Sequence, residues 1–434
     1  MVHTRIHRLS QNGNPRRSKT ALVLAGGGIT GAVYEVGALQ AIDDMLPDRT
    51  VNDFDIYVGT SAGAMVAAML ANGLSPREMM QTIDDTHPEI RAIEAGDIFQ
   101  SNIREMGRRL TRLPRALWRM GQRVLQDFQD LTVTDILWEL TEALPTGIFS
   151  GNALEQYVRE VLSLPGCVNR FDYLEKTLYV IATDLDSGER AVFGKGGRGI
   201  VPISKAVAAS SAVPLLYKPV EIFGRHYIDG GIRGHASLDL AIEAGANLVL
   251  CINPLTPLNV RELNTGERHI SDEGVQAIVN QVVRILLHGA LRYHIKNLRA
   301  KYPDVDIILI EPRPDDEKMF YYNLMHYRNR LLVANHGFES VTMGVSENFE
   351  YFQTVLARHG IQLTQRLVRE ELEEIRRQGY DPETLRAILE RGGPVRSRTS
   401  RNGTLDSLLT RLEDSLARLE QVVNGADGSP APSA

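Results

Sequence analysis

A glycine-flanked serine, at the junction of a short apolar strand and an alanine-rich helix, constrains this chain more than any other stretch. The motif is Gly59-Thr60-Ser61-Ala62-Gly63. Residues 56–58 are β-branched or aromatic and predict a buried strand, and residues 62–70 predict a helix. Such a junction forces the serine backbone into a strained shape, and the glycines remove Cβ atoms that would collide there. We therefore expect Ser61 Oγ to be an exposed nucleophile above a helix N-terminus, where negative charge is favoured.

A second glycine-rich turn lies one strand–helix unit earlier. Residues 20–25 form an apolar run that predicts a buried parallel strand, and residues 32–45 predict a helix. Between them stands Gly26-Gly27-Gly28-Ile29-Thr30-Gly31, whose backbone N–H groups at a helix N-terminus form an anion site. The spacing differs from a dinucleotide-binding fingerprint, and no phosphate-loop lysine follows. Because parallel strands end at one sheet edge, we expect Gly27 and Gly28 to join Ala62 as an oxyanion hole.

Composition narrows the class of protein. A net charge of −6 over 434 residues gives no overall electrostatic match to nucleic acid, so we expect no nucleic-acid partner. Two cysteines are too few for a disulfide framework and lack metal-site spacing. No apolar run approaches 18 residues, so we expect a cytoplasmic protein that is at most peripheral at a membrane. Residues 1–19 are basic and predict a disordered tail, with weak attraction to an anionic surface as the alternative.

Further strands and helices alternate along the chain and indicate an α/β fold. Strands are expected at 177–183, 189–193, 220–223, 226–228, 247–252 and 305–310. Helices are expected after Gly73 from a Ser75-Pro76-Arg77-Glu78 capping box, and at 151–162, 203–211, 238–244 and 275–299. Helical patterns then run from 328 to about 391, with Pro382 opening a new turn.

Residues 104–125 predict a basic amphipathic insertion. Its cationic face comprises Arg104, Arg108, Arg112, Arg115, Arg119 and Arg123. One interpretation is a solvated helix packed on the core, and the other is an interfacial element on anionic lipid.

The C-terminal segment carries a second helical pattern. Residues 392–403 indicate a linker, and leucines within 405–423 form a heptad seam in a helix over 404–424. An isolated helix of this length needs a partner, which is either the body of the chain or the same helix of a second subunit. Residues 425–434 predict a disordered tail.

A serine nucleophile needs a base, and Asp229 is the conspicuous candidate. It precedes Gly230 and Gly231 at the end of a predicted strand, where glycine permits a sharp turn and leaves space around the carboxylate. None of the eleven histidines has a motif-like setting. Asp229 could therefore accept the serine proton directly, as a dyad, or it could simply form an Asx turn at a strand end.

Taken together, the three glycine blocks resemble the patatin-like acyl hydrolases in order and context. The stretches Thr183-Asp184-Leu185 with Gly188-Glu189, and Ala209-Ser210-Ser211 leading to Pro214, resemble that family as well. The resemblance covers roughly residues 20–253. It implies Ser61 as nucleophile, Asp229 as base and Gly26, Gly27 and Gly28 at the oxyanion, with Gly31, Gly59, Gly63, Gly230 and Gly231 as motif glycines. It implies no metal, no cofactor and a lipid acyl-ester substrate.

The resemblance also implies a patatin-like three-layer α/β fold with a mainly parallel sheet. We expect a catalytic domain at 20–320 and a helical C-terminal region at 321–391. The family often carries Arg or Lys where this chain has Thr30, so ester hydrolysis is better supported than a preference for phospholipids. The same residues would serve a phospholipase A or lysophospholipase, a transacylase or a thioesterase, since all use an acyl-enzyme. A lipid-binding scaffold with a vestigial site is the non-enzymatic alternative.

Overall fold

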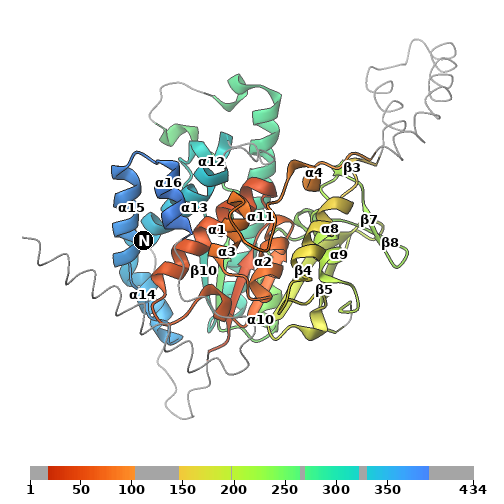
Figure 1. Cartoon of the computed structure of the whole chain (residues 1–434), viewed down its shortest axis with the longest axis horizontal. Coiled ribbons are helices and arrows are strands. Elements are labelled where there is room, and N and C mark those ends of the chain that lie inside the picture. The colour runs from red at the N-terminus through yellow and green to blue at the C-terminus, as the bar shows by residue number, and fades with distance from the viewer. Residues whose placement is uncertain (1–17, 103–145, 197, 264–268, 322–329, 391–434) are drawn as a thin grey trace, which may run out of the picture.

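A mainly parallel sheet of eight strands runs through the body of the molecule (Figure 1). The computed structural model describes residues 18–102, 146–196, 198–263, 269–321 and 330–390. The strand order is β10-β9-β1-β2-β4-β8-β7, with β5 paired to β4, and β5, β7 and β8 run antiparallel to their partners. The strands are β1 Thr20–Leu24, β2 Ile56–Thr60, β4 Thr177–Asp184, β5 Arg190–Gly194, β7 Val220–Ile222, β8 Arg225–Asp229, β9 Leu248–Ile252 and β10 Asp306–Ile310.

Helices cover both faces of the sheet, which is why its central strands are uninterrupted apolar runs. Leu22 and Leu24 of β1 enter one core, while Ala21 and Val23 enter a second core on the opposite face. This alternation confirms the predicted α/β fold with a mainly parallel sheet between helical layers. The first face is covered by α1 Gly28–Met45, α2 Ala62–Ala71, α3 Pro76–Asp84, α8 Asn152–Val161 and α9 Ile203–Ser210, and the second by α10 Leu238–Glu243 and α11 Val275–Lys301.

The C-terminal helices pack directly on the body. Helix α13 crosses α1 so closely that a Cβ at Gly37 would lie 1.8 Å from the carbonyl oxygen of Ala334. Val333 and Phe338 of α13 are buried in the same core as α1, so the expected helical extension is part of that core. The helices are α12 Glu317–Tyr321, α13 Arg330–Glu347, α14 Phe349–Arg358, α15 Arg366–Arg377 and α16 Pro382–Leu389.

Two local features differ from the expectations. Helix α1 begins at Gly28 rather than near residue 32, because the Gly31 N–H already donates to the Gly27 carbonyl at 2.9 Å. A short parallel pair, β3 Gly147–Phe149 with β6 Leu215–Tyr217, was not expected at all, and the four-residue helix α4 Ala95–Ile98 precedes it. The capping box does start α3, where Ser75 Oγ accepts from the Glu78 N–H.

Several predicted segments lie outside the described residues. These are residues 1–17 of the basic tail, the arginine insertion at 104–125, the linker at 392–403, the heptad helix at 404–424 and the tail at 425–434. Among the helices that the structure describes, none combines the length and apolar character needed to cross a bilayer.

Candidate active site

Ser61 stands at the turn between β2 and α2 with a strained backbone. Its φ is +54°, a left-handed value that a residue with a side chain rarely adopts. The flanking glycines are required by space: a Cβ at Gly59 would lie 2.5 Å from Ala64 Cα, and one at Gly63 would lie 2.6 Å from the Leu24 carbonyl oxygen. The close contact of α2 with β2 and β1 therefore fixes the elbow that the sequence predicts.

Ser210, at the end of α9, anchors this elbow. The Ser61 N–H donates to Ser210 Oγ at 2.8 Å, and Ser210 Oγ in turn donates to the carbonyl of Ile181 in β4. All of these groups are buried, so the chain of hydrogen bonds links α9, the elbow and the sheet. The sequence marked Ser210 only as part of a family-like stretch and gave no sign of this contact.

The sheet register brings Asp229 to Ser61. Strands β2 and β8 both pair with the edge of β4 that lies opposite β5. Parallel β2 ends with Thr60 beside Ile181, and antiparallel β8 ends with Asp229 beside Ala182. The two strands thus meet end to end, and their C-terminal residues face each other. A Cβ at Gly230 would lie 2.2 Å from the Ile181 carbonyl oxygen, so only glycine permits this approach.

The Asp229 carboxylate is buried and held by backbone groups. The carboxylate Oδ1 accepts the Gly231 N–H at 2.7 Å, and the backbone N–H of Asp229 donates to the Ala212 carbonyl at 2.9 Å. Burial raises the pKa of Asp229 to about 6, while hydrogen bonding from Ser61 and Gly231 acts in the opposite direction. Ser61 is therefore a neighbour of the carboxylate, yet Oδ2 accepts no hydrogen bond of ordinary geometry from a described residue.

The glycine loop lies against the nucleophile. A Cβ at Gly26 would contact Ser61 Cβ at 3.2 Å, and one at Gly27 would lie 2.5 Å from Pro254 Cγ. Gly28 has a φ of +61° and opens α1, while a Cβ at Gly31 would lie 3.0 Å from the same Pro254 atom. Ala62 is the first residue of α2, where N–H groups lack an acceptor within the helix. The structure thus brings all predicted oxyanion residues to one place.

The two histidines nearest to Asp229 in the sequence lie in different environments. His226 is about half exposed, and its Nδ1 lies 3.5 Å from Asp186 Oδ2 on the surface. His235 is buried beside Gly26, with its Nε2 2.9 Å from Asn253 Oδ1. That oxygen also accepts the Leu255 N–H, so Nε2 is the donor, and burial lowers the pKa of His235 to about 4. The His235 ring is therefore neutral at neutral pH.

Two spaces open from Ser61 in different directions. A narrow pocket of about 100 Å³ runs between α1, α2, α3 and α8 and has a mainly apolar wall, and we call it the apolar pocket. A wider groove of about 800 Å³ passes Asp229, His235 and the glycine loop. Ser61, Gly28 and Val213 line both spaces. A substrate with a long apolar arm and a polar part could thus place its junction at the serine.

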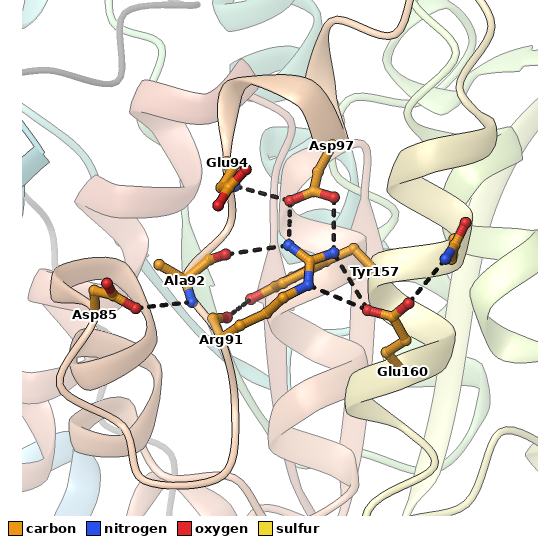
Figure 2. A network of polar contacts seen from close by, with 8 residues as sticks. Asp85, Arg91, Ala92, Glu94, Asp97, Tyr157 and Glu160 are labelled. Carbon is orange, nitrogen blue, oxygen red and sulfur yellow. Dashed lines mark hydrogen bonds and ion pairs between the residues drawn. The ribbon is translucent and has the colours of Figure 1, made fainter.

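A polar network surrounds Tyr157, a residue that lines the apolar pocket (Figure 2). Arg91 pairs with Asp97 at 2.6 Å and with Glu160 at 3.2 Å, and its guanidinium lies 5.0 Å from the centre of the Tyr157 ring. The Glu94 N–H donates to the same Asp97 carboxylate at 2.8 Å. These contacts join α4 and the segment between α3 and α4 to α8.

Several known proteins are similar to this chain. An uncharacterised protein of Bacillus subtilis (strain 168), YqhO, is 24% identical over 207 residues, which is 46% of this chain and 57% of that protein. The probable lipid hydrolase 463L of invertebrate iridescent virus 6 is 21% identical over 53% of this chain and 65% of its own length. The intracellular phospholipase A2 of Caenorhabditis elegans is 45% identical over 71 residues, which is 15% of this chain and 6% of that protein.

Each match covers less than two thirds of the relative's own length. Among solved structures, VipD from Legionella pneumophila aligns with a TM-score of 0.32 and 16% identity over 76% of this chain and 67% of that chain. The family model described as patatin-like phospholipase matches residues 22–242, which include the glycine loop, the serine elbow and the Asp229 turn. The chain therefore belongs to the patatin-like phospholipases, a family of carboxylic-ester hydrolases.

Proposed function

We propose that this protein is a serine acyl hydrolase that cleaves acyl esters of membrane lipids, of the phospholipase A or lysophospholipase type, through a dyad of Ser61 and Asp229. The observation that carries the proposal is the end-to-end meeting of β2 and β8, which sets the strained Ser61 beside a buried carboxylate. A carboxylate with a pKa raised to about 6 is a stronger base than an ordinary aspartate and is still ionised at neutral pH.

In the acylation step, Ser61 Oγ attacks the ester carbonyl carbon while its proton passes to Asp229. The Ser61 N–H is already bonded to Ser210, so the oxyanion donors would be N–H groups of the glycine loop and of Ala62. The bond from carbon to the leaving oxygen then breaks, and Asp229 returns its proton to the alcohol. Water then attacks the acyl carbon and gives a proton to Asp229. The bond from that carbon to Ser61 Oγ breaks, Asp229 returns the proton to Ser61 Oγ, and the fatty acid is released.

The two spaces at Ser61 support a lipid substrate. The acyl chain would lie in the apolar pocket, because burying it there removes its methylene groups from water. The glycerol and head group would lie in the groove, next to the polar residues. The family model and the similarity to a probable lipid hydrolase point to the same substrate class.

Replacing Ser61 with Ala tests the proposal. We expect Ser61→Ala to abolish both fatty-acid release from a mixed lipid extract and labelling by a fluorophosphonate probe. His226→Ala, which changes a surface residue, is the matched control and retains most activity. A folded His235→Ala enzyme that is as inactive as Ser61→Ala, next to an active Asp229→Asn enzyme, would make histidine the base and refute the dyad.

A further inference from the structure

The first half of α11 exposes a continuous apolar surface. Its side chains are between 40% and 77% exposed. Within residues 275–287 the one charged side chain, Arg284, is buried and donates to the carbonyls of Thr256 and Met319 at 3.1 and 2.7 Å. The surface therefore carries no charge. We call it the α11 face, and it consists of Val275, Ile278, Val279, Val282, Val283, Ile285 and Leu286.

The second half of the same helix has an ordinary solvated surface. Arg292, Lys296, Arg299 and Lys301 are all exposed there. Figure 1 shows the first half of α11, in green, projecting above the body at the top of the view. Seven exposed aliphatic side chains on one projecting half-helix cost free energy in water, because apolar area is left unburied. Because the second half of α11 has a charged outer surface, an apolar outer surface is not needed to form this helix.

The α11 face is continuous with the catalytic groove. Val279 and Val283 belong to the face and also line the groove that contains Ser61 and Asp229. The groove wall continues through Leu287 of α11 and through Ile232 and Tyr321, which are 62% and 40% exposed. A lipid that entered the groove from this side would pass a mainly apolar wall, with Glu273, Gln276 and Asn280 among its polar members, before it reached Ser61.

We propose that the α11 face is the surface by which the protein docks on a lipid bilayer, so that the groove opens directly onto the membrane. The inference rests on the proposed function, since it assigns the route by which that substrate arrives. A second copy of the chain on this face would lie across the groove that the substrate must enter. Asp272 and Glu273, in η5 Ile270–Glu273, stand just before α11, so the face attracts no anionic head groups and its binding is hydrophobic.

Vesicle binding of the full chain tests the proposal on a Ser61→Ala background, which removes any dependence on hydrolysis. The probe is a vesicle of zwitterionic phosphatidylcholine, and the variant is Val282→Asp with Leu286→Asp, neither of which lines the groove. We expect binding to fall at least ~10-fold, because two apolar contacts are lost and two charges face the lipid. Phe223→Asp is the control: Phe223 is 77% exposed in the turn between β7 and β8, away from α11 in Figure 1.

Salt and a soluble substrate separate this inference from its alternatives. We expect wild-type binding to persist at high salt and without anionic lipid, because no charge on the face is involved. Binding that requires anionic lipid and is lost in salt would overturn the proposal, as would equal binding by the double Asp variant. In the active enzyme that variant retains hydrolysis of a soluble short-chain ester while vesicle hydrolysis falls. Loss of both activities would also contradict docking, and an inactive wild type would contradict the proposed function itself.

Discussion

The two spaces that meet at Ser61 are lined by different kinds of residues. The apolar pocket is walled by packed helices, and most of its lining side chains are apolar. The groove contains the ionisable groups near the serine, Asp229 and His235, together with the glycine loop. We therefore expect size to control which acyl chains the pocket accepts, and charge and hydrogen bonding to control the reaction in the groove. Substitutions on the two sides of Ser61 are expected to change different properties of the enzyme.

On the groove side, Asp229→Asn is expected to have the largest effect. The amide keeps the shape of the carboxylate but cannot accept the serine proton, so we expect kcat/KM to fall by roughly 10³–10⁴-fold. In the wild type, kcat/KM should decline below about pH 6 as Asp229 becomes protonated. Steady-state kinetics between pH 4 and 8 on a soluble ester measure both effects. An acid limb unchanged in the Asn variant would show that another group is the base.

The same substitution is expected to stabilise the folded protein at neutral pH. Because folding raises the pKa of Asp229 from 3.8 to about 6, its protonated form stabilises the fold below pH 4, and this contribution disappears as pH rises through 6. At pH 7 the wild type carries a buried charge at Asp229, which lowers the free energy of unfolding by up to about 3 kcal/mol. Asparagine carries no charge and so removes this cost. Urea unfolding should show that Asp229→Asn is more stable than the wild type at pH 7 and about equally stable at pH 4. If the variant were less stable than the wild type at pH 7, the prediction that the buried charge of Asp229 destabilises the fold would be wrong.

On the pocket side, Val36→Phe is expected to change chain-length preference. Val36 is buried in α1 and lines the apolar pocket, so a larger ring there shortens the space for an acyl chain. We expect kcat/KM to fall ~10- to 100-fold for long-chain esters and little for short ones, as about 1.4 to 2.7 kcal/mol of binding is lost. Val283→Phe, on the groove wall, is the matched control and should leave that preference unchanged. An equal loss at every chain length would mean that the pocket holds no acyl chain.

Arg91→Ala, next to the pocket residue Tyr157, is expected to have the smallest effect. Its ion pairs with Asp97 and Glu160 are partly exposed, and such pairs contribute about 0–1 kcal/mol. We therefore expect the free energy of unfolding to fall by less than about 1 kcal/mol and short-chain kinetics to stay unchanged. Denaturant melts compare the variant with wild type. A loss well above this range would mean that the network of Figure 2 supports the pocket wall more strongly than its exposure suggests.

Local sequence predicted the elbow because its determinants are local. Glycines at 59 and 63 and the change from an apolar strand to an alanine-rich helix are sufficient to place Ser61. The sequence pattern places the start of α1 four residues too late, because glycines disfavour a helix. The close approach of Pro254, which leaves no space for a Cβ at Gly27 or Gly31, has no signal in the local sequence. The strands β3 and β6 have three residues each and are too short to produce a periodic pattern.

The meeting of Ser61 and Asp229 could not be predicted from either segment alone. It depends on β8 running antiparallel to β4 and ending where β2 ends, a register that no neighbouring residue encodes. The family resemblance supplied the pairing that local reasoning lacked. The contacts of Ser210 with the elbow and of Asn253 with His235 join residues 149 and 18 positions apart, and neither has a sequence signal.

The close crossing of α1 and α13 has a consequence for the newborn chain on the ribosome. Strand β1 lies between β2 and β9, and the outer side of α1 is covered by α13. Residues 20–45 therefore cannot complete their native packing until β9, from residue 248, and α13, from residue 330, have been synthesised. At typical elongation rates this wait lasts on the order of half a minute. During that time the aliphatic helix and an unpaired strand edge stay exposed, and nascent chains of this protein should be strong clients for chaperones.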